Sequence, residues 1–112
     1  MSSPSKIKGT AAETAVVNYL RQKGWKNAER RALQGVLDRG DISGVESVCF
    51  EVKNLKAQDL AGWISELLIE IINSKAKTGA VIHKRKGKTD VGDWYATMPM
   101  SVYVELLKQA GY

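Results

Sequence analysis

The segment from Glu46 to Lys53 alternates between apolar and mostly polar side chains, and this pattern constrains the fold more than any other. Successive side chains of a β-strand point to opposite faces of the sheet. The alternation therefore predicts a strand with one buried face and one partly polar face. The apolar face holds Val48, Phe50 and Val52, and the opposite face holds Ser47, Cys49, Glu51 and Lys53.

Apolar residues recur every three or four positions over about residues 57–75, just after this strand. This spacing is typical of an amphipathic helix, which we expect to cover the sheet and to end before Gly79. The repeating residues are Leu60, Ile64, Leu67, Leu68, Ile71 and Ile72.

Before the strand, the spacing of Thr10 and Glu13 is that of a capping box, and Gly24 is a typical helix end. The sequence therefore predicts a first helix over about residues 10–23. A turn-rich stretch follows, for which we expect strands over residues 28–33 and 40–44, joined through a turn at Gln34-Gly35.

After the long helix, we expect a buried strand at residues 80–82, a basic loop over residues 84–92 and a returning strand over residues 94–98. A last helix would be capped by Ser101 and ended by Gly111, with Val102, Leu106 and Ala110 facing inward. The predicted order is helix, three strands, helix, two strands and helix. This order favours an α/β sandwich around a mixed sheet.

With 112 residues, the chain has the length of one domain, residues 1–112. It is 44% apolar and 26% charged, which is typical of a folded protein, and its net charge of +5 favours polyanionic partners. The lone Cys49 excludes an internal disulfide, and the lone His83 excludes a multi-histidine metal site within one chain. No apolar stretch is long enough for a bilayer, so we expect no membrane partner and a cytoplasmic location.

Hydrolysis of a phosphodiester needs charge stabilisation at the phosphate and a deprotonated water, both of which carboxylate-bound Mg²⁺ can supply. Asp41 and Glu51 are candidates for the metal ligands, because a tight turn at Gly44-Val45 would fold the Asp41 segment back beside the strand. The Val52 carbonyl lies between Glu51 and Lys53. Lys53 would orient the water or oppose the charge that develops on the phosphate.

Two further acidic residues have alternative interpretations. Glu13 is either the capping partner of Thr10 or an additional metal ligand, bound directly or through water. Asp38 is either a turn residue or a weaker ligand candidate.

The basic residues have two interpretations as well. The run from Lys84 to Lys88 is either a solvated loop or a binding site for DNA phosphates. If it binds phosphates, it recognises the shape of the DNA and not its base sequence. The aromatic residues Trp63, Trp94 and Tyr95 either stack on bases or pack within the protein. Candidate DNA-binding residues are Lys6, Lys8, Arg30, Arg31, Arg39, Lys84, Arg85, Lys86 and Lys88.

Four stretches resemble the PD-(D/E)XK nuclease superfamily, and more narrowly the small Holliday-junction resolvases of archaea and their phage counterparts. Gly40 stands where the name-giving proline of the superfamily would be. The stretches are Lys8-Gly9-Thr10 with Glu13, Leu33-Gln34-Gly35 with Asp38, Gly40 to Gly44, and Phe50-Glu51-Val52-Lys53-Asn54.

This resemblance implies a restriction-endonuclease-like core, with a mixed sheet flanked by helices in the order αβββαβ plus a further strand and a C-terminal helix. It implies that Asp41, Glu51 and Glu13 bind Mg²⁺, for which Mn²⁺ would substitute, and that Lys53 assists catalysis. The enzyme would act as a homodimer that makes paired nicks in four-way DNA junctions. One interface for such a symmetric dimer would be the set of excess apolar side chains on the predicted helix at residues 60–72, with Trp63 beside them.

Two alternatives remain open at this point. One is another nuclease of the same superfamily, of the restriction, repair or flap-cutting type. The other is a non-catalytic, basic nucleic-acid-binding module in which the acidic residues are structural.

Overall fold

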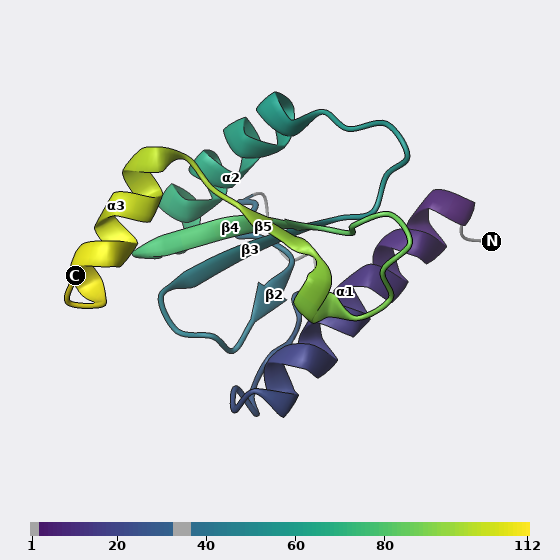
Figure 1. Ribbon diagram of the computed structural model, residues 1–112, viewed down its shortest axis with the longest axis horizontal. Helices are drawn as coiled ribbons and strands as arrows, with labels where there is room; N and C mark the ends of the chain where they lie inside the picture. The colour runs from purple at the N-terminus through teal and green to yellow at the C-terminus, as the bar shows by residue number, and fades with distance from the viewer. Residues whose placement is uncertain (1–2, 33–36) are drawn as a thin grey trace.

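The computed structural model describes residues 3–32 and 37–112, and its elements follow the predicted order. The proposed turn at Gln34-Gly35 lies outside the described residues. Figure 1 shows the helices arranged around a central sheet. The elements are α1 (Pro4–Gln22), β1 (Glu29–Arg30), β2 (Ile42–Ser43), β3 (Val48–Lys53), α2 (Leu60–Ser74), β4 (Thr78–His83), the 3-10 helix η1 (Val91–Asp93), β5 (Tyr95–Thr97) and α3 (Met100–Gln109).

The central sheet is mixed and has the strand order β3-β4-β5. β3 runs parallel to β4, with Glu51 opposite Val81 and Lys53 opposite His83, whereas β4 and β5 are antiparallel. The α/β class with a mixed sheet is thus confirmed. β1 and β2 form a separate antiparallel ladder, so the prediction that the Asp41 segment folds back beside β3 holds only for a short contact, described below.

Each face of the sheet packs against a different helix. On one face, Val52 of β3 belongs to a core cluster with Val16 and Leu20 of α1. On the other face, Cys49 clusters with Leu67 of α2 and with Val81. Figure 1 shows α1 and α2 on opposite sides of the sheet. The face of β3 that carries Glu51 and Lys53 is therefore the face that α2 covers.

The start of α1 differs from the capping-box prediction. Pro4 occupies the first helical turn, and the Ser3 side chain accepts a hydrogen bond from the Lys6 amide at 3.2 Å. Proline is favoured at this position because its missing N–H would have no partner there. Thr10 and Glu13 consequently lie inside the helix, and the prediction that they form a capping box is wrong.

The start of α3 also differs from the prediction, because Pro99 and not Ser101 precedes its first turn and no side chain caps it. Val102 and Leu106 are half-buried as expected, but Ala110 is exposed. None of the helices in the described part of the chain has the length and apolarity needed to span a bilayer.

Gly40 allows the segment before β2 to approach β3 closely. Its φ angle is +94°, and a Cβ atom built on it would lie 2.8 Å from the Phe50 carbonyl oxygen and 3.0 Å from Cys49 Sγ. A side chain at this position would therefore be strained by both its backbone conformation and its neighbours. The next residue, Asp41, donates its amide hydrogen to that same Phe50 carbonyl at 2.8 Å.

We expect Gly40→Ala to lower the free energy of unfolding by about 2 kcal/mol, because it adds both backbone strain and overlap with β3. Urea unfolding followed by circular dichroism measures this change. Gly9→Ala is the matched control, since Gly9 lies within α1 and a Cβ there meets nothing within 4 Å. The control is expected to be neutral or stabilising, and an equal loss in both variants would contradict the close approach at Gly40.

Candidate active site

β3 presents Glu51 and Lys53 to the face covered by α2. Glu51 is only 5% exposed. Lys53 Nζ lies 3.8 Å from Glu51 Oε1 and 3.2 Å from Oε2 of Glu66, a residue of α2. The predicted pairing of Glu51 with Lys53 on one strand face is therefore present, and α2 adds a second carboxylate to the lysine.

Asp41 is fixed against β3 by its side chain as well as by its backbone. Its Oδ2 atom accepts a hydrogen bond from the Val52 amide at 2.7 Å. This contact brings the Asp41 carboxyl group beside that of Glu51, and the two groups raise each other's energy when both are charged. The predicted meeting of Asp41 and Glu51 is thus seen, although Asp41 lies just before β2 and not within a strand.

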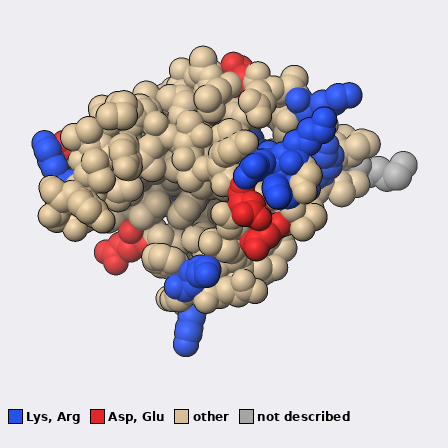
Figure 2. Space-filling view, in the orientation of Figure 1, with Lys and Arg blue, Asp and Glu red and all other residues tan. Residues whose placement is uncertain are grey.

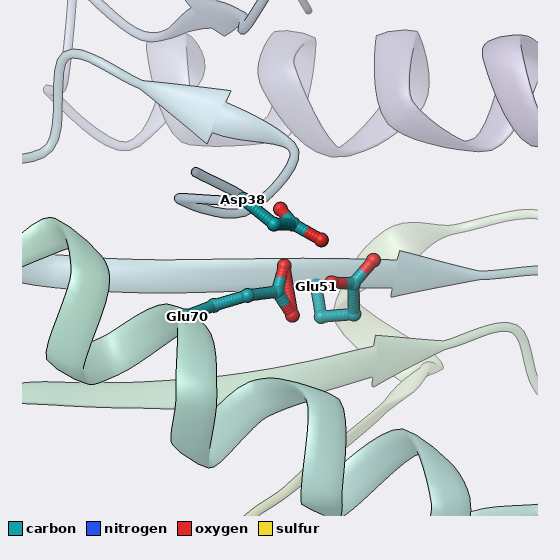
Figure 3. A group of neighbouring side chains, drawn as sticks. All are labelled: Asp38, Glu51 and Glu70. Atoms are coloured by element: carbon teal, nitrogen blue, oxygen red, sulfur yellow. The ribbon is translucent and has the colours of Figure 1, made fainter. Parts of the chain in front are cut away.

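Glu70 of α2 is a member of the site that the sequence analysis missed. It is 1% exposed, and its carboxylate lies next to those of Asp38 and Glu51 (Figure 3). One oxygen from each of these three residues lies within 4.8 Å of the others, an arrangement that could hold a metal ion. We call Asp38, Asp41, Glu51 and Glu70 the carboxylate cluster.

The sequence did contain a signal for Glu70. It follows the buried residues Trp63 and Leu67 by seven and three positions, so it falls on the buried stripe of α2. A charged residue within such a stripe is rarely fully buried without a partner. Looking for polar residues inside the apolar pattern, and not only for the apolar ones, would have identified it.

Three carboxylate oxygens of the cluster are buried without a hydrogen-bond partner. They are Oε2 of Glu51 and both Oε1 and Oε2 of Glu70. Burying an unpaired charged group is costly, and proteins compensate for it by protonation, by pairing or by metal binding. The cluster therefore needs a proton or a cation.

The electrostatics of the cluster agree with this need. Burial, followed by the neighbouring Glu51, raises the pKa of Asp41 to about 8. Burial, followed by Glu70, raises the pKa of Glu51 to about 8. Burial, together with Asp38, also raises the pKa of Glu70 to about 7.

Lys53 is the one basic residue that forms an ion pair with the cluster within residues 3–32 and 37–112. Burial acts to lower its pKa, but the nearby carboxylates of Glu51 and Glu66 outweigh this effect and raise it. Lys53 is therefore a charged ammonium group at neutral pH. One such charge, shared with Glu66, does not balance four carboxylates.

Glu13 lies apart from this grouping. Its Oε1 atom accepts a hydrogen bond and ion pair from Arg30 Nε at 2.9 Å, and Arg30 also approaches the Thr10 hydroxyl at 3.5 Å. The three-residue group that could hold a metal does not include Glu13. The roles of Glu13 and of the Val52 carbonyl as metal ligands stay predictions. Arg30, a candidate DNA-binding residue, forms its ion pair with Glu13.

The basic run begins where the candidate site ends. The Lys84 amide donates to the Lys53 carbonyl at 3.2 Å, so the loop between β4 and β5 starts beside Lys53. Lys84 and Arg85 lie over the rings of Trp94 and Tyr95 at 5.9 and 6.0 Å. Figure 2 shows basic side chains gathered on the side of the molecule where this loop lies. Exposed members of the run are Arg85, Lys86 and Lys88, whereas Lys84 is half-buried.

The aromatic residues divide between the two interpretations. Trp63 is 4% exposed and packs against His83 with ring centroids 5.6 Å apart, so its role is in the core and stacking on a base is excluded in this conformation. It also cannot contribute to an interface on the outer face of α2. Tyr95 is 46% exposed and remains accessible.

A separate cavity of about 380 Å³ opens at the beginning of β3, lined by residues that include Ser47, Val48 and Ala76. No member of the carboxylate cluster lines it. We assign the chemistry to the cluster because unpaired buried charges, and not the size of a hollow, identify a reactive site.

Comparison of the chain with models of protein families, with curated protein sequences and with solved structures found no match.

In EDTA, we expect the free energy of unfolding to fall by about 2 kcal/mol between about pH 6.5 and pH 8, measured by urea unfolding. The folded protein keeps protons on Asp41, Glu51 and Glu70 in this range, whereas the unfolded chain has already lost them. Stability is therefore lost as pH rises. His83, whose pKa burial lowers, is neutral in both states over most of this window and contributes little.

Glu70→Gln removes one of these carboxyl groups and should flatten the pH dependence. Glu105→Gln is the matched control, because Glu105 is exposed on α3 and pairs only with Lys108 within the described residues. Stability that is constant or rising with pH in the wild-type protein would show that the cluster is not protonated when folded.

Proposed function

We propose that this protein is a metal-dependent, structure-selective DNA endonuclease of the PD-(D/E)XK type with a restriction-endonuclease-like core. The observation that carries the proposal is the convergence of Asp41, Glu51 and Lys53 from two separate segments. The buried oxygen of Glu51 that has no hydrogen-bond partner supports a bound cation, and the neighbouring carboxylates offer the oxygen ligands that Mg²⁺ prefers. The favoured cation is Mg²⁺, with Mn²⁺ as its substitute.

Each residue of the site has a role in this proposal. Bound Mg²⁺ would supply charge stabilisation at the scissile phosphate and lower the pKa of water. Asp41 and Glu51 would hold the ion, and the Val52 amide fixes the orientation of Asp41. Because this hydrogen bond uses Oδ2, the other oxygen of Asp41 is the one that would face the metal.

Lys53 would act on the phosphate. Its ammonium group is held between Glu51 and Glu66, and its side chain is 19% exposed, so it can contact a substrate at the surface without losing its position. A positioned charged donor that opposes developing negative charge commonly lowers the activation free energy by about 3 kcal/mol.

The loop between β4 and β5 would bind the DNA backbone. The loop starts beside Lys53 and carries exposed positive charges. A DNA strand bound along the loop would therefore bring a phosphate group to the site. Contacts of this kind detect the shape of DNA and not its sequence. A four-way junction is the favoured substrate.

A homodimer would place two sites on a nearly two-fold symmetric junction. The outer face of α2 offers an apolar surface for this assembly, without Trp63. Its exposed members are Leu60, Leu68, Ile69 and Ile72.

A nuclease assay on a synthetic four-way junction tests the proposal. Wild-type protein should make paired nicks with Mg²⁺, whereas Asp41→Asn and Lys53→Ala should each lose at least about a hundredfold in rate, because each removes a group that stabilises the transition state. Both variants should still bind the junction in Ca²⁺. Lys108→Ala on α3 is the control and should cut at the wild-type rate.

Each alternative has its own outcome. Equal cleavage rates on junctions, flaps and linear duplexes would show that the protein is not a junction resolvase and would favour another nuclease of the PD-(D/E)XK type. Metal-independent binding without any cutting would favour the non-catalytic module. Cutting that survives in Asp41→Asn and Lys53→Ala would refute the site assignment.

Replacement of Lys86 and Lys88 by alanine should weaken junction binding and make its salt dependence shallower, since fewer phosphate charges are neutralised. Fluorescence anisotropy at several salt concentrations measures both effects. The slope of log K against log salt should fall by about two in magnitude. An unchanged slope would show that Lys86 and Lys88 do not contact DNA phosphates. Lys108→Ala again serves as the control.

A further inference from the structure

We propose that Glu70 of α2 and Asp38 are metal ligands that share a divalent cation with Glu51. The inference deepens the proposed function and rests on it for the role of Glu51. It extends the site from one sheet face to three parts of the chain: the segment before β2, strand β3 and helix α2.

The geometry suits a single ion. One oxygen from each of Asp38, Glu51 and Glu70 lies within 4.8 Å of the others. Two oxygens on opposite sides of Mg²⁺ are about 4.2 Å apart, and about 4.6–5.2 Å apart around Ca²⁺. Figure 3 shows the three carboxylates converging from their separate elements.

The burial of Glu70 is an independent indication of a ligand. The residue is 1% exposed, and neither of its side-chain oxygens has a hydrogen-bond partner. A glutamate that only stabilised α2 would be expected at the surface or paired with a buried donor. Glu70 instead points toward two other carboxylates, which is unfavourable unless a proton or a cation lies between them, and a cation would neutralise all three groups at once.

Helix α2 also holds Asp38 in place. The Asn73 side chain, less than one turn after Glu70, donates to the Asp38 carbonyl oxygen at 2.8 Å. The Gly40 amide donates to Asp38 Oδ1 at 3.0 Å. These contacts orient the Asp38 side chain and leave Oδ2 for the ion, in the way that outer contacts orient metal ligands elsewhere.

The donor set selects the class of cation. The three side chains that converge here, Asp38, Glu51 and Glu70, all offer carboxylate oxygens. Hard divalent cations such as Mg²⁺, Mn²⁺ and Ca²⁺ prefer such sites, whereas Zn²⁺ sites are usually built from nitrogen and sulfur.

Calorimetric titration with MnCl₂ at about pH 8, without DNA, tests the inference. The full-length wild-type protein should bind Mn²⁺, and Glu70→Gln should bind it about tenfold or more weakly, since even the loss of an outer contact costs a site this much. Glu105→Gln, which makes the same change of charge on α3, should bind like the wild type.

Asp38→Asn gives a second variant for which folding is not in question, because Asp38 is exposed and asparagine can still accept from the Gly40 amide. It should also weaken Mn²⁺ binding about tenfold. Circular dichroism confirms that each variant is folded before its titration.

The outcomes separate this inference from the endonuclease proposal. Wild-type affinity for Mn²⁺ in both Glu70→Gln and Asp38→Asn would overturn the inference, even if the protein cuts DNA through Asp41, Glu51 and Lys53. Weakened binding in both variants would support it, even if the wild-type protein cuts no DNA. A wild-type protein that binds no Mn²⁺ would also overturn it.

Discussion

Asp41 is bonded to β3 twice, through its amide to the Phe50 carbonyl and through its carboxylate to the Val52 amide. The rest of the site depends on this attachment, because β1 and β2 form a ladder of their own and are not paired with the central sheet. Gly40 makes it possible by leaving no Cβ against the strand. Two hydrogen bonds thus fix the position of a side chain that lies outside any strand.

The attachment has an electrostatic cost. It adds Asp41 to a face of the sheet where Glu51 and Glu70 are already buried, and within the described part of the chain Lys53 is the one cation that pairs with the cluster. In a chain of net charge +5, this cluster is a local concentration of negative charge beside a basic loop. Such an arrangement lowers stability unless a proton or a metal compensates for it. Functional sites commonly contain such repelling charges with shifted pKa values, which supports the proposal that the cluster binds a cation.

The sequence predicted the parts of the fold that depend on local periodicity. The alternation of β3 correctly placed Glu51 and Lys53 on one face, and the spacing of α2 correctly predicted a helix that covers the sheet. Its buried side was only partly correct: Leu67 is buried, but Leu60, Leu68 and Ile72 are exposed, and the buried stripe contains Trp63 and Glu70. Features that depend on tertiary contacts were harder to predict. Thr10 and Glu13 have the spacing of a helix cap, yet Ser3 and Pro4 begin the helix six residues earlier. The spacing of Glu70 does mark it as buried, but its role in the site was missed because its partners come from segments distant in the sequence.

The central claim is that these carboxylates converge around a divalent cation. The most direct measurement is anomalous diffraction from crystals of the protein grown with Mn²⁺. The account predicts a peak within the carboxylate cluster of Asp38, Asp41, Glu51 and Glu70, about 2.2 Å from the coordinating oxygens. A peak elsewhere, or carboxyl groups in direct contact with each other and no peak between them, would contradict it.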